Sequence, residues 1–214
     1  MKIFRFLLVA ALFVTASLVL PHLPDQVPTH WNTYGEPDTF SSKEFAAFLV
    51  PFMSLGFLVL FPLLAKIDPK KENYPKFKAS WEWIQTLLFS MLAYFYGVQL
   101  FVTLVPEKQS MLPRLMFIGL ALLFIALGNS IGKVRQNFFV GLKTPWTLSD
   151  PEVWQKSQRV TGWSFVIGGL IFLVLSILGA IPYLGTIFIA VTIVMVAFPV
   201  FYSYFVFRAK NSKK

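Results

Sequence analysis

The stretch FAAFLVPFMSLGFLVLFPLLA, residues 45–65, contains no charged side chain. A helix needs about 20 apolar residues to cross the hydrocarbon core of a bilayer. This stretch therefore predicts a transmembrane helix, and five further blocks of the chain have the same character. The six predicted spans cover residues 3–20, 45–65, 83–105, 115–131, 160–181 and 184–207.

The composition agrees with a membrane protein. Of the 214 residues, 56% are hydrophobic and 14% are charged, whereas a soluble domain usually carries about 25% charged residues. The apolar blocks leave no segment long enough for a separate soluble core. We therefore expect an all-α fold, a polytopic helical membrane protein with about six transmembrane helices that form a single membrane domain over residues 1–214. The chain has no cysteine, which excludes disulfides and thiolate metal sites.

Lysine and arginine predict the orientation in the membrane. If the N-terminus is inside, all but three of the 19 basic residues fall in cytoplasmic segments, the exceptions being Lys43, Lys108 and Arg114. Basic residues concentrate on the cytoplasmic side of membrane proteins. We therefore expect a multi-pass protein of the bacterial cell membrane with both termini cytoplasmic, residues 21–44 extracellular and residues 132–159 cytoplasmic.

The basic residues at the N-terminus and the net positive charge each allow another interpretation. The first apolar block follows Lys2 and Arg5, as a cleaved signal peptide would, but Pro21-His22-Leu23-Pro24 is a poor cleavage site, which favours a retained helix. The net charge of +9 could indicate nucleic-acid binding. No basic module or aromatic RNA-binding motif accompanies it, so contact with the anionic lipid bilayer is the better interpretation.

The extracellular segment is a polar interruption rich in turn-forming residues. Prolines restrict its backbone, Asn32 and Gly35 favour turns, and Asp38, Ser41 or Ser42 can cap the following helix, so we expect a compact loop. Trp31 and Tyr34 are also explained by a belt of aromatic residues at the headgroups. The two histidines and nearby carboxylates match no zinc or calcium spacing, and we expect no metal or other cofactor.

The cytoplasmic segment carries the densest pattern of polar and aromatic residues. Thr144-Pro145-Trp146 predicts an extended or turn segment, after which Thr147 or Ser149 can cap a short helix that begins with Asp150. The spacing of Val153, Trp154 and Ser157 predicts an amphipathic helix that rests on the inner membrane surface. A docking site for a cytoplasmic partner is the other interpretation of this segment.

At these two segments the chain resembles the bacterial SdpI-like immunity protein family. The outer match is Leu23-Pro24-Asp25-Gln26-Val27-Pro28-Thr29-His30-Trp31-Asn32, followed by Gly35, Asp38 and Lys43. The inner match comprises Gly128-Asn129, Lys133-Val134-Arg135, Asn137, Phe139, Gly141, Thr144-Pro145-Trp146-Thr147-Leu148, Val153-Trp154 and Gly162. Lys143 stands where arginine is expected, and Ser157-Gln158-Arg159 where a Thr-His-Arg run is expected. Lysine keeps the charge but lacks the planar donor fork of arginine.

The resemblance implies a six-span protein that recognises a secreted antimicrobial peptide toxin at its outer face and confers resistance. It also implies a signalling receptor that holds a cytoplasmic transcriptional repressor at the membrane. We therefore expect the ligand-binding residues to be His30, Trp31, Asn32, Gly35 and Asp38, and the partner-binding residues to be Lys133, Arg135, Asn137, Lys143, Thr144, Pro145, Trp146 and Trp154.

Two other classes of function receive less support from the sequence. An enzyme lacks its usual groups, because Ser130 has no histidine in its own leaflet and no paired carboxylates lie within the spans, so we expect no catalytic residues. A transporter or channel could use the prolines within the spans, Pro51, Pro62 and Pro199, to break helices around a path. We see no buried charged residue deep in any span to carry ions along such a path.

Overall fold

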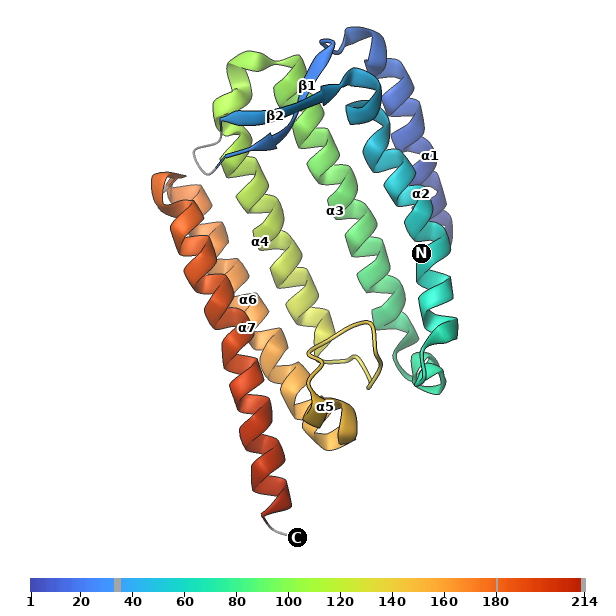
Figure 1. The fold of residues 1–214 in the computed structure, drawn as a ribbon, viewed down its shortest axis with the longest axis vertical. Helices are drawn as coiled ribbons and strands as arrows, with labels where there is room; N and C mark the ends of the chain where they lie inside the picture. The colour runs from blue at the N-terminus through green and yellow to red at the C-terminus, as the bar shows by residue number, and fades with distance from the viewer. Residues whose placement is uncertain (33–35, 180, 213–214) are drawn as a thin grey trace.

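The computed structural model describes residues 1–32, 36–179 and 181–212. Its described part contains six helices that are long and apolar enough to cross a membrane. They lie side by side along the long axis of the molecule (Figure 1). The predicted all-α, polytopic helical fold is confirmed. The long helices are α1 Lys2–Val19, α2 Lys43–Ile67, α3 Lys78–Leu104, α4 Leu112–Ile131, α6 Pro151–Leu178 and α7 Ile181–Asn211.

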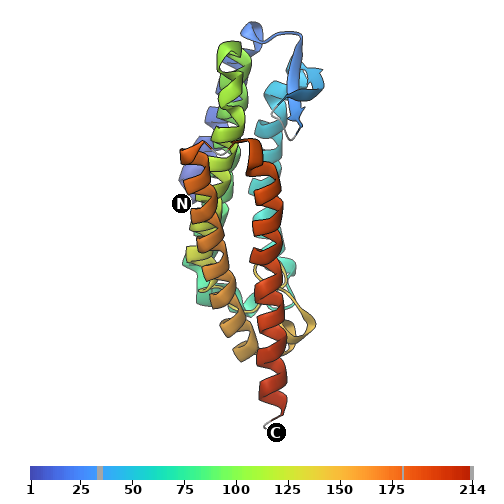
Figure 2. The same cartoon turned by 90° about the vertical axis from the view of Figure 1, so that its left-hand side faces the viewer.

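Shorter elements join these helices. A two-stranded antiparallel sheet, β1 Gln26–Trp31 and β2 Pro37–Ser42, precedes α2, and the five-residue helix α5 Pro145–Ser149 precedes α6. The 3₁₀ helices are η1 Leu20–His22, η2 Lys71–Phe77 and η3 Pro106–Met111. Figures 1 and 2 show β1 and β2 at one end of the bundle, here the hairpin end, and α5 near the opposite end, here the loop end.

The hairpin is more regular than the compact loop that the sequence predicts. Its register pairs Gln26 with Ser42 and Val27 with Ser41, with irregularities beyond Pro28. Val27 is fully buried against α1, α2 and α3, and this burial specifies which face of β1 packs on the bundle. Ser42 caps α2 by accepting a hydrogen bond from the backbone N–H of Phe45 at 3.3 Å, as predicted.

The predicted surface helix near residue 150 is wrong. Residues 151–159 form the first turns of α6, which continues without a break to Leu178. Asp150 is the cap of this helix and accepts hydrogen bonds from the backbone N–H groups of Glu152 and Val153 at 2.8 and 3.1 Å. The stretch that begins at Thr144 is not extended beyond its first residue, because Pro145 starts α5.

Glycines let α4 and α6 approach until their backbones touch. A Cβ atom built on Gly162 would lie 2.6 Å from the carbonyl oxygen of Gly128, and one built on Gly169 would lie 2.8 Å from that of Ala121. Such distances exclude any side chain at these positions without a shift of the helices. Close packing of small residues therefore fixes α6 against α4.

Candidate functional sites at the two ends of the bundle

The first candidate site is the exposed face of the β1–β2 hairpin. His30 and Asp38 face each other across the strands, with 2.6 Å between His30 Nδ1 and Asp38 Oδ1, and their side chains are 67% and 43% exposed. Phe40 on β2 is also half exposed. The hairpin thus presents an ionisable pair beside an aromatic ring, a combination that suits an amphipathic ligand.

The far end of the hairpin is closed by Asn32. Its backbone N–H donates to the carbonyl of Glu36 at 2.9 Å, and its side-chain oxygen accepts from the backbone N–H of Glu36 at 3.0 Å. The Asn32 amide group also donates to the Glu36 carboxylate at 3.1 Å. Asn32 therefore joins the end of β1 to the residue that precedes β2. Gly35 and Tyr34, which the sequence analysis also singled out, lie outside the described residues.

The hairpin is fixed to the helices by its other face. The Trp31 ring packs against Val98 and Val102 of α3 and Leu112 of α4, and the Gln99 amide group of α3 donates to the carbonyl of Pro28 at 3.2 Å. Because α3 contributes to both contacts, this helix positions the exposed face. Trp31 anchors the hairpin in this way, while His30 and Asp38 remain accessible.

An ion pair holds the base of the hairpin. Lys43, the first residue of α2, lies 2.7 Å from the Asp25 carboxylate. The hydrogen bond and the charge of Lys43 lower the pKa of Asp25 below its ordinary value. Exposed pairs of this kind are worth little in stability, so we assign it the role of orienting the chain between η1 and β1.

The second candidate site is the segment between α4 and α6, residues 132–150, here the α4–α6 loop. Asn137 is fully buried within it. Its amide nitrogen donates to the carbonyls of Arg135 and Val140 at 2.8 and 3.0 Å, and its oxygen accepts from the N–H groups of Phe139 and Val140 at 2.9 and 2.7 Å. Asn137 therefore determines the path of the loop from its interior.

Two further residues with predicted binding roles also support the loop. Trp154 is 1% exposed, and its indole N–H donates to the carbonyl of Val134 at 2.9 Å. Lys143 donates to the carbonyls of Phe138 and Phe139 at 3.2 and 3.3 Å. The buried Trp154 holds the start of the loop, and Lys143 stabilises its bend.

Helix α5 links the loop to α7. Thr144 caps α5 in a reciprocal capping box with Thr147, and Pro145 occupies its first turn. The Trp146 indole N–H donates to the hydroxyl of Ser203 at 2.6 Å, and its ring lies 5.5 Å from that of Tyr204. Trp146 therefore connects the loop to the last helix.

A buried carboxylate, overlooked in the sequence, ties the α4–α6 loop to the segment after α2. Asp68 is 1% exposed. It accepts hydrogen bonds from the Tyr74 hydroxyl and the Phe138 N–H, both at 2.9 Å, and from the Lys70 N–H at 2.7 Å. Asp68 therefore joins η2 to the loop. In the sequence Asp68 stands among lysines, as many solvated carboxylates do. Nothing in the local sequence indicates that it is buried.

Gln158 occupies the position where the family pattern predicts histidine. The side chain is fully buried. Its oxygen accepts from the Leu142 N–H at 2.9 Å, and its nitrogen donates to the Leu142 carbonyl at 3.0 Å. It approaches Gly141, whose φ of 115° favours glycine, so closely that a Cβ there would lie 2.7 Å from the Gln158 oxygen. Gln158 therefore closes the loop against α6.

Positive charge gathers in a cleft of about 500 Å³ beside the loop. Arg135 in this cleft donates to the Gln155 side chain at 2.8 Å, and Gln155 donates to the carbonyl of Gly132 at 2.7 Å. The charged residues that line the cleft, all basic, are Lys76, Lys78, Lys133, Arg135 and Arg159. Among the residues predicted to bind a partner, Lys133 and Arg135 are those that the structure places in this basic cleft.

Arg5 is a charged residue that is buried near the end of a span rather than deep within it. This residue lies in the first turn of α1 and is 5% exposed. Its guanidinium donates to the Gln85 side chain at 2.8 Å and to the Glu82 carbonyl at 3.3 Å. Arg5 was treated as a marker of orientation, and its acceptors lie too far along the sequence for any local pattern to predict the contact.

No group of three or more metal-ligating side chains occurs within the described residues.

The fold and its two end sites define a polytopic helical membrane protein with an anchored hairpin at one end and a folded loop beside a basic cleft at the other. The chain matches the model of the SdpI/YfhL protein family over residues 133–203 and that of a domain of unknown function (DUF1648) over residues 6–55. The two matches contain the loop and the hairpin, respectively.

One relative is similar over the whole chain. The immunity protein SdpI of Bacillus subtilis (strain 168) is 26% identical over 214 residues, which is 100% of this chain and 99% of the relative. No solved structure matches. The chain is thus a membrane protein that is similar to an SdpI-like family, and the resemblance drawn from its two segments is confirmed.

Proposed function

We propose that this protein is a bacterial immunity protein that protects the cell from a secreted antimicrobial peptide. Similarity over the full length to a relative named as an immunity protein supports this proposal. The observation that carries the recognition step is the hairpin, which exposes His30, Asp38 and Phe40 on one face while its other face is anchored to α3 and α4. A fixed scaffold with an exposed polar and aromatic face fits an amphipathic peptide.

The proposed orientation places the hairpin outside the cell and the α4–α6 loop inside, with both termini cytoplasmic. The distribution of lysine and arginine supports this orientation. All five charged side chains of the cleft beside the loop are basic. In this orientation the peptide meets the hairpin from the outside, and the cleft faces the cytoplasm.

The cleft supports a second proposed role, the docking of a cytoplasmic transcriptional repressor. Five basic side chains around about 500 Å³ favour an acidic surface on the partner. A peptide at the hairpin changes the affinity of the cleft only if it binds two arrangements of the protein unequally. Helix α3 reaches both sites, since Gln99 holds the hairpin and Lys78 lines the cleft.

Survival of a sensitive bacterium tests the immunity role. Cells that express the protein are challenged with a panel of secreted killing peptides, and we expect protection against at least one of them. His30→Ala combined with Asp38→Ala removes the exposed pair without touching the packed face of the hairpin, and we expect it to abolish most of the protection. The matched control is His22→Ala, which alters the other histidine of the chain, outside both strands.

Two outcomes would contradict the proposed recognition step. Protection that is unchanged in the double variant, at equal abundance in the membrane, would exclude the exposed pair as the recognition surface. A complete lack of protection by the parent protein against every peptide, at verified expression, would favour a transport or signalling role. Arg135→Ala separates the two proposed roles, because we expect it to weaken repressor docking and to leave survival unchanged.

A further inference from the structure

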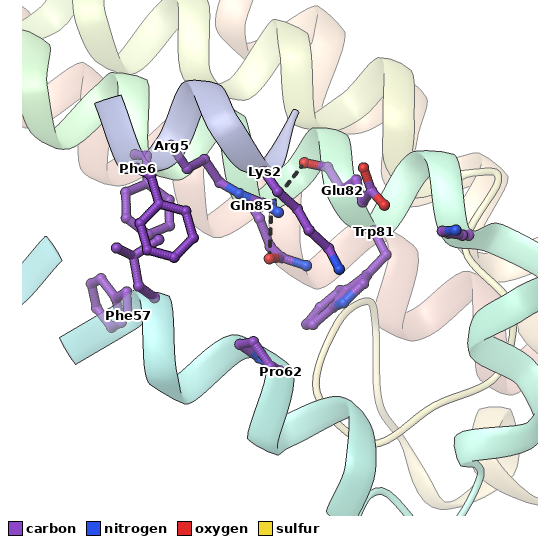
Figure 3. Close-up of a pocket in the computed structure, with 11 residues that line it drawn as sticks. Lys2, Arg5, Phe6, Phe57, Pro62, Trp81, Glu82 and Gln85 are labelled. Atoms are coloured by element: carbon purple, nitrogen blue, oxygen red, sulfur yellow. Dashed lines mark hydrogen bonds between the residues drawn. The ribbon is translucent and has the colours of Figure 1, made fainter. Parts of the chain in front are cut away.

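The start of α1 lies farther from the loop end than the last turn of α2 and the start of α3 do. In both views the N-terminus lies partway along the bundle, while α2 and α3 continue toward the loop end (Figures 1 and 2). A cleft of about 380 Å³ lies at the start of α1, bounded by α1, α2 and α3. Figure 3 shows this cleft with its lining side chains.

One part of the cleft is cationic. Lys2, Arg5 and Lys78 line it together with a single carboxylate, that of Glu82. Hydrogen bonds to Gln85 and to the Glu82 carbonyl, drawn as dashed lines in Figure 3, hold the Arg5 guanidinium in place. None of the ion pairs formed by the described residues involves the three basic side chains. Three basic side chains and one carboxylate leave the cleft with an excess of positive charge. The two acceptors of Arg5 are neutral and do not offset this charge.

The remaining wall of the cleft is apolar and open on one side. Phe6 of α1 is 64% exposed, and Phe57 and Pro62 of α2 continue the same wall. Figure 3 shows Phe6 on α1 and Phe57 on α2, both among the side chains that line the cleft. In a bilayer, the exposed Phe6 ring meets acyl chains rather than water.

The depth of the cleft matches the headgroup region of one leaflet. With 18 residues, α1 is about 27 Å long, close to the hydrocarbon thickness of about 30 Å. If the hairpin end is at the outer surface, Lys2 lies at the inner headgroups. This placement rests on the orientation argued for the proposed function.

We propose that the cleft binds one anionic phospholipid of the inner leaflet. Lys2, Arg5 and Lys78 receive the phosphate and the anionic headgroup, and an acyl chain lies along Phe6 and Phe57. Charge complementarity decides the class of ligand, because an apolar helix in this cleft would bury three cations with only the Glu82 carboxylate to balance them. The buried Arg5 supplies a planar donor fork, and the two lysines supply point charges that favour a second negative group.

Lipid binding to the purified full-length protein tests this proposal. The detergent-solubilised protein is titrated with phosphatidylglycerol or phosphatidylcholine, and bound lipid is measured by native mass spectrometry. We expect a phosphatidylglycerol adduct that persists at collision energies that strip phosphatidylcholine. Lys2→Gln combined with Lys78→Gln should weaken phosphatidylglycerol binding about thirtyfold, while Arg5 and its hydrogen bonds stay intact.

The control has the same change in net charge at the same end of the molecule. Lys66→Gln combined with Lys71→Gln alters two exposed lysines that do not line this cleft, and we expect the parent affinity. A second variant, Leu58→Trp, fills the apolar wall and should also weaken binding. Equal retention of the two lipids, or equal loss in both lysine pairs, would overturn the proposal. Displacement of the lipid by millimolar inorganic phosphate would also overturn it, because the site would then belong to a free anion.

Discussion

The buried Asp68 provides a direct way to detach the α4–α6 loop from the rest of the loop end. Its carboxylate accepts three hydrogen bonds, and one of them, from the Phe138 N–H, crosses to the loop. We expect Asp68→Ala to release this connection and to leave the hairpin unchanged. The η2 side and the loop side of the basic cleft should become more loosely joined, because, among the hydrogen bonds of the described residues, only those from Lys70 and Asn73 to Gln136 would still connect them.

The magnitude follows from the number and kind of hydrogen bonds. A hydrogen bond to a charged group contributes about 1.5 to 3 kcal/mol. Three such bonds, of which the one from the Lys70 N–H is easily replaced by water, give about 4 kcal/mol for the Ala variant. Tyr74→Phe removes a single bond and should cost about 2 kcal/mol. A difference of 4 kcal/mol corresponds to about a thousandfold change in the equilibrium for local opening.

Amide hydrogen exchange in detergent micelles measures this opening. Exchange of residues 133–143 should accelerate by about a thousandfold in Asp68→Ala and by about thirtyfold in Tyr74→Phe. Peptides that cover the hairpin report on any spread of the effect and serve as an internal reference. Unchanged exchange in residues 133–143, or equal acceleration at both ends, would refute the assignment of Asp68 as a local connection.

Three further predictions test the packing and the charges. Gly162→Ala should lower the Tm in detergent through a loss of about 1 to 3 kcal/mol, since its Cβ would lie 2.6 Å from the Gly128 carbonyl, whereas Gly97→Ala, with open space around it, should not lower the Tm. Ser203→Ala should loosen α5 from α7, and a double-mutant cycle with Trp146→Phe should show a coupling energy of about 1 kcal/mol, since the pair shares one hydrogen bond. Lys210 lowers the pKa of Asp150 by a hydrogen bond. The stability that this contact contributes is therefore fully present above the pKa of Asp150 in the unfolded chain, about 3.9, and is lost as the pH falls through the lower pKa of Asp150 in the folded protein. If the ion pair holds α7 and the loop together, the distance between spin labels on these two segments should increase in that acidic range in the parent protein. In Asp150→Asn the larger distance should be present at every pH.

Hydropathy alone was sufficient to predict the six spans, because a bilayer allows few solutions for long apolar segments. The same approach failed between residues 150 and 159. The polar residues there have the composition of an interfacial helix, but Asp150 caps α6 directly and no residue after it interrupts the helix. Trp154 is a residue type that often anchors a helix at the membrane surface, but here it is buried beneath the loop. A local pattern cannot distinguish these outcomes, since the contacts that bury Trp154 come from distant segments.

The candidate sites show the same limit. The motifs fall in the two end segments, and the two basic residues Lys133 and Arg135 line a cleft. The motifs did not separate residues that face solvent from residues that support the backbone, such as Asn137 and Thr144. Arg5 and Asp68 were overlooked because a single charged residue beside an apolar block is usually solvated, and only the assembled helices surround them with acceptors.

The distant acceptors of Arg5 affect how the protein enters the membrane. The Glu82 carbonyl and the Gln85 side chain follow Arg5 by 77 and 80 residues. At a bacterial synthesis rate of about 5 to 20 residues per second, α1 leaves the ribosome about 4 to 16 s before these groups are made. A guanidinium is costly within hydrocarbon, so Arg5 must stay at the headgroups during this interval. The first helix therefore inserts early, but Arg5 exchanges its contacts with water and headgroups for its final hydrogen bonds only after the third helix has joined it.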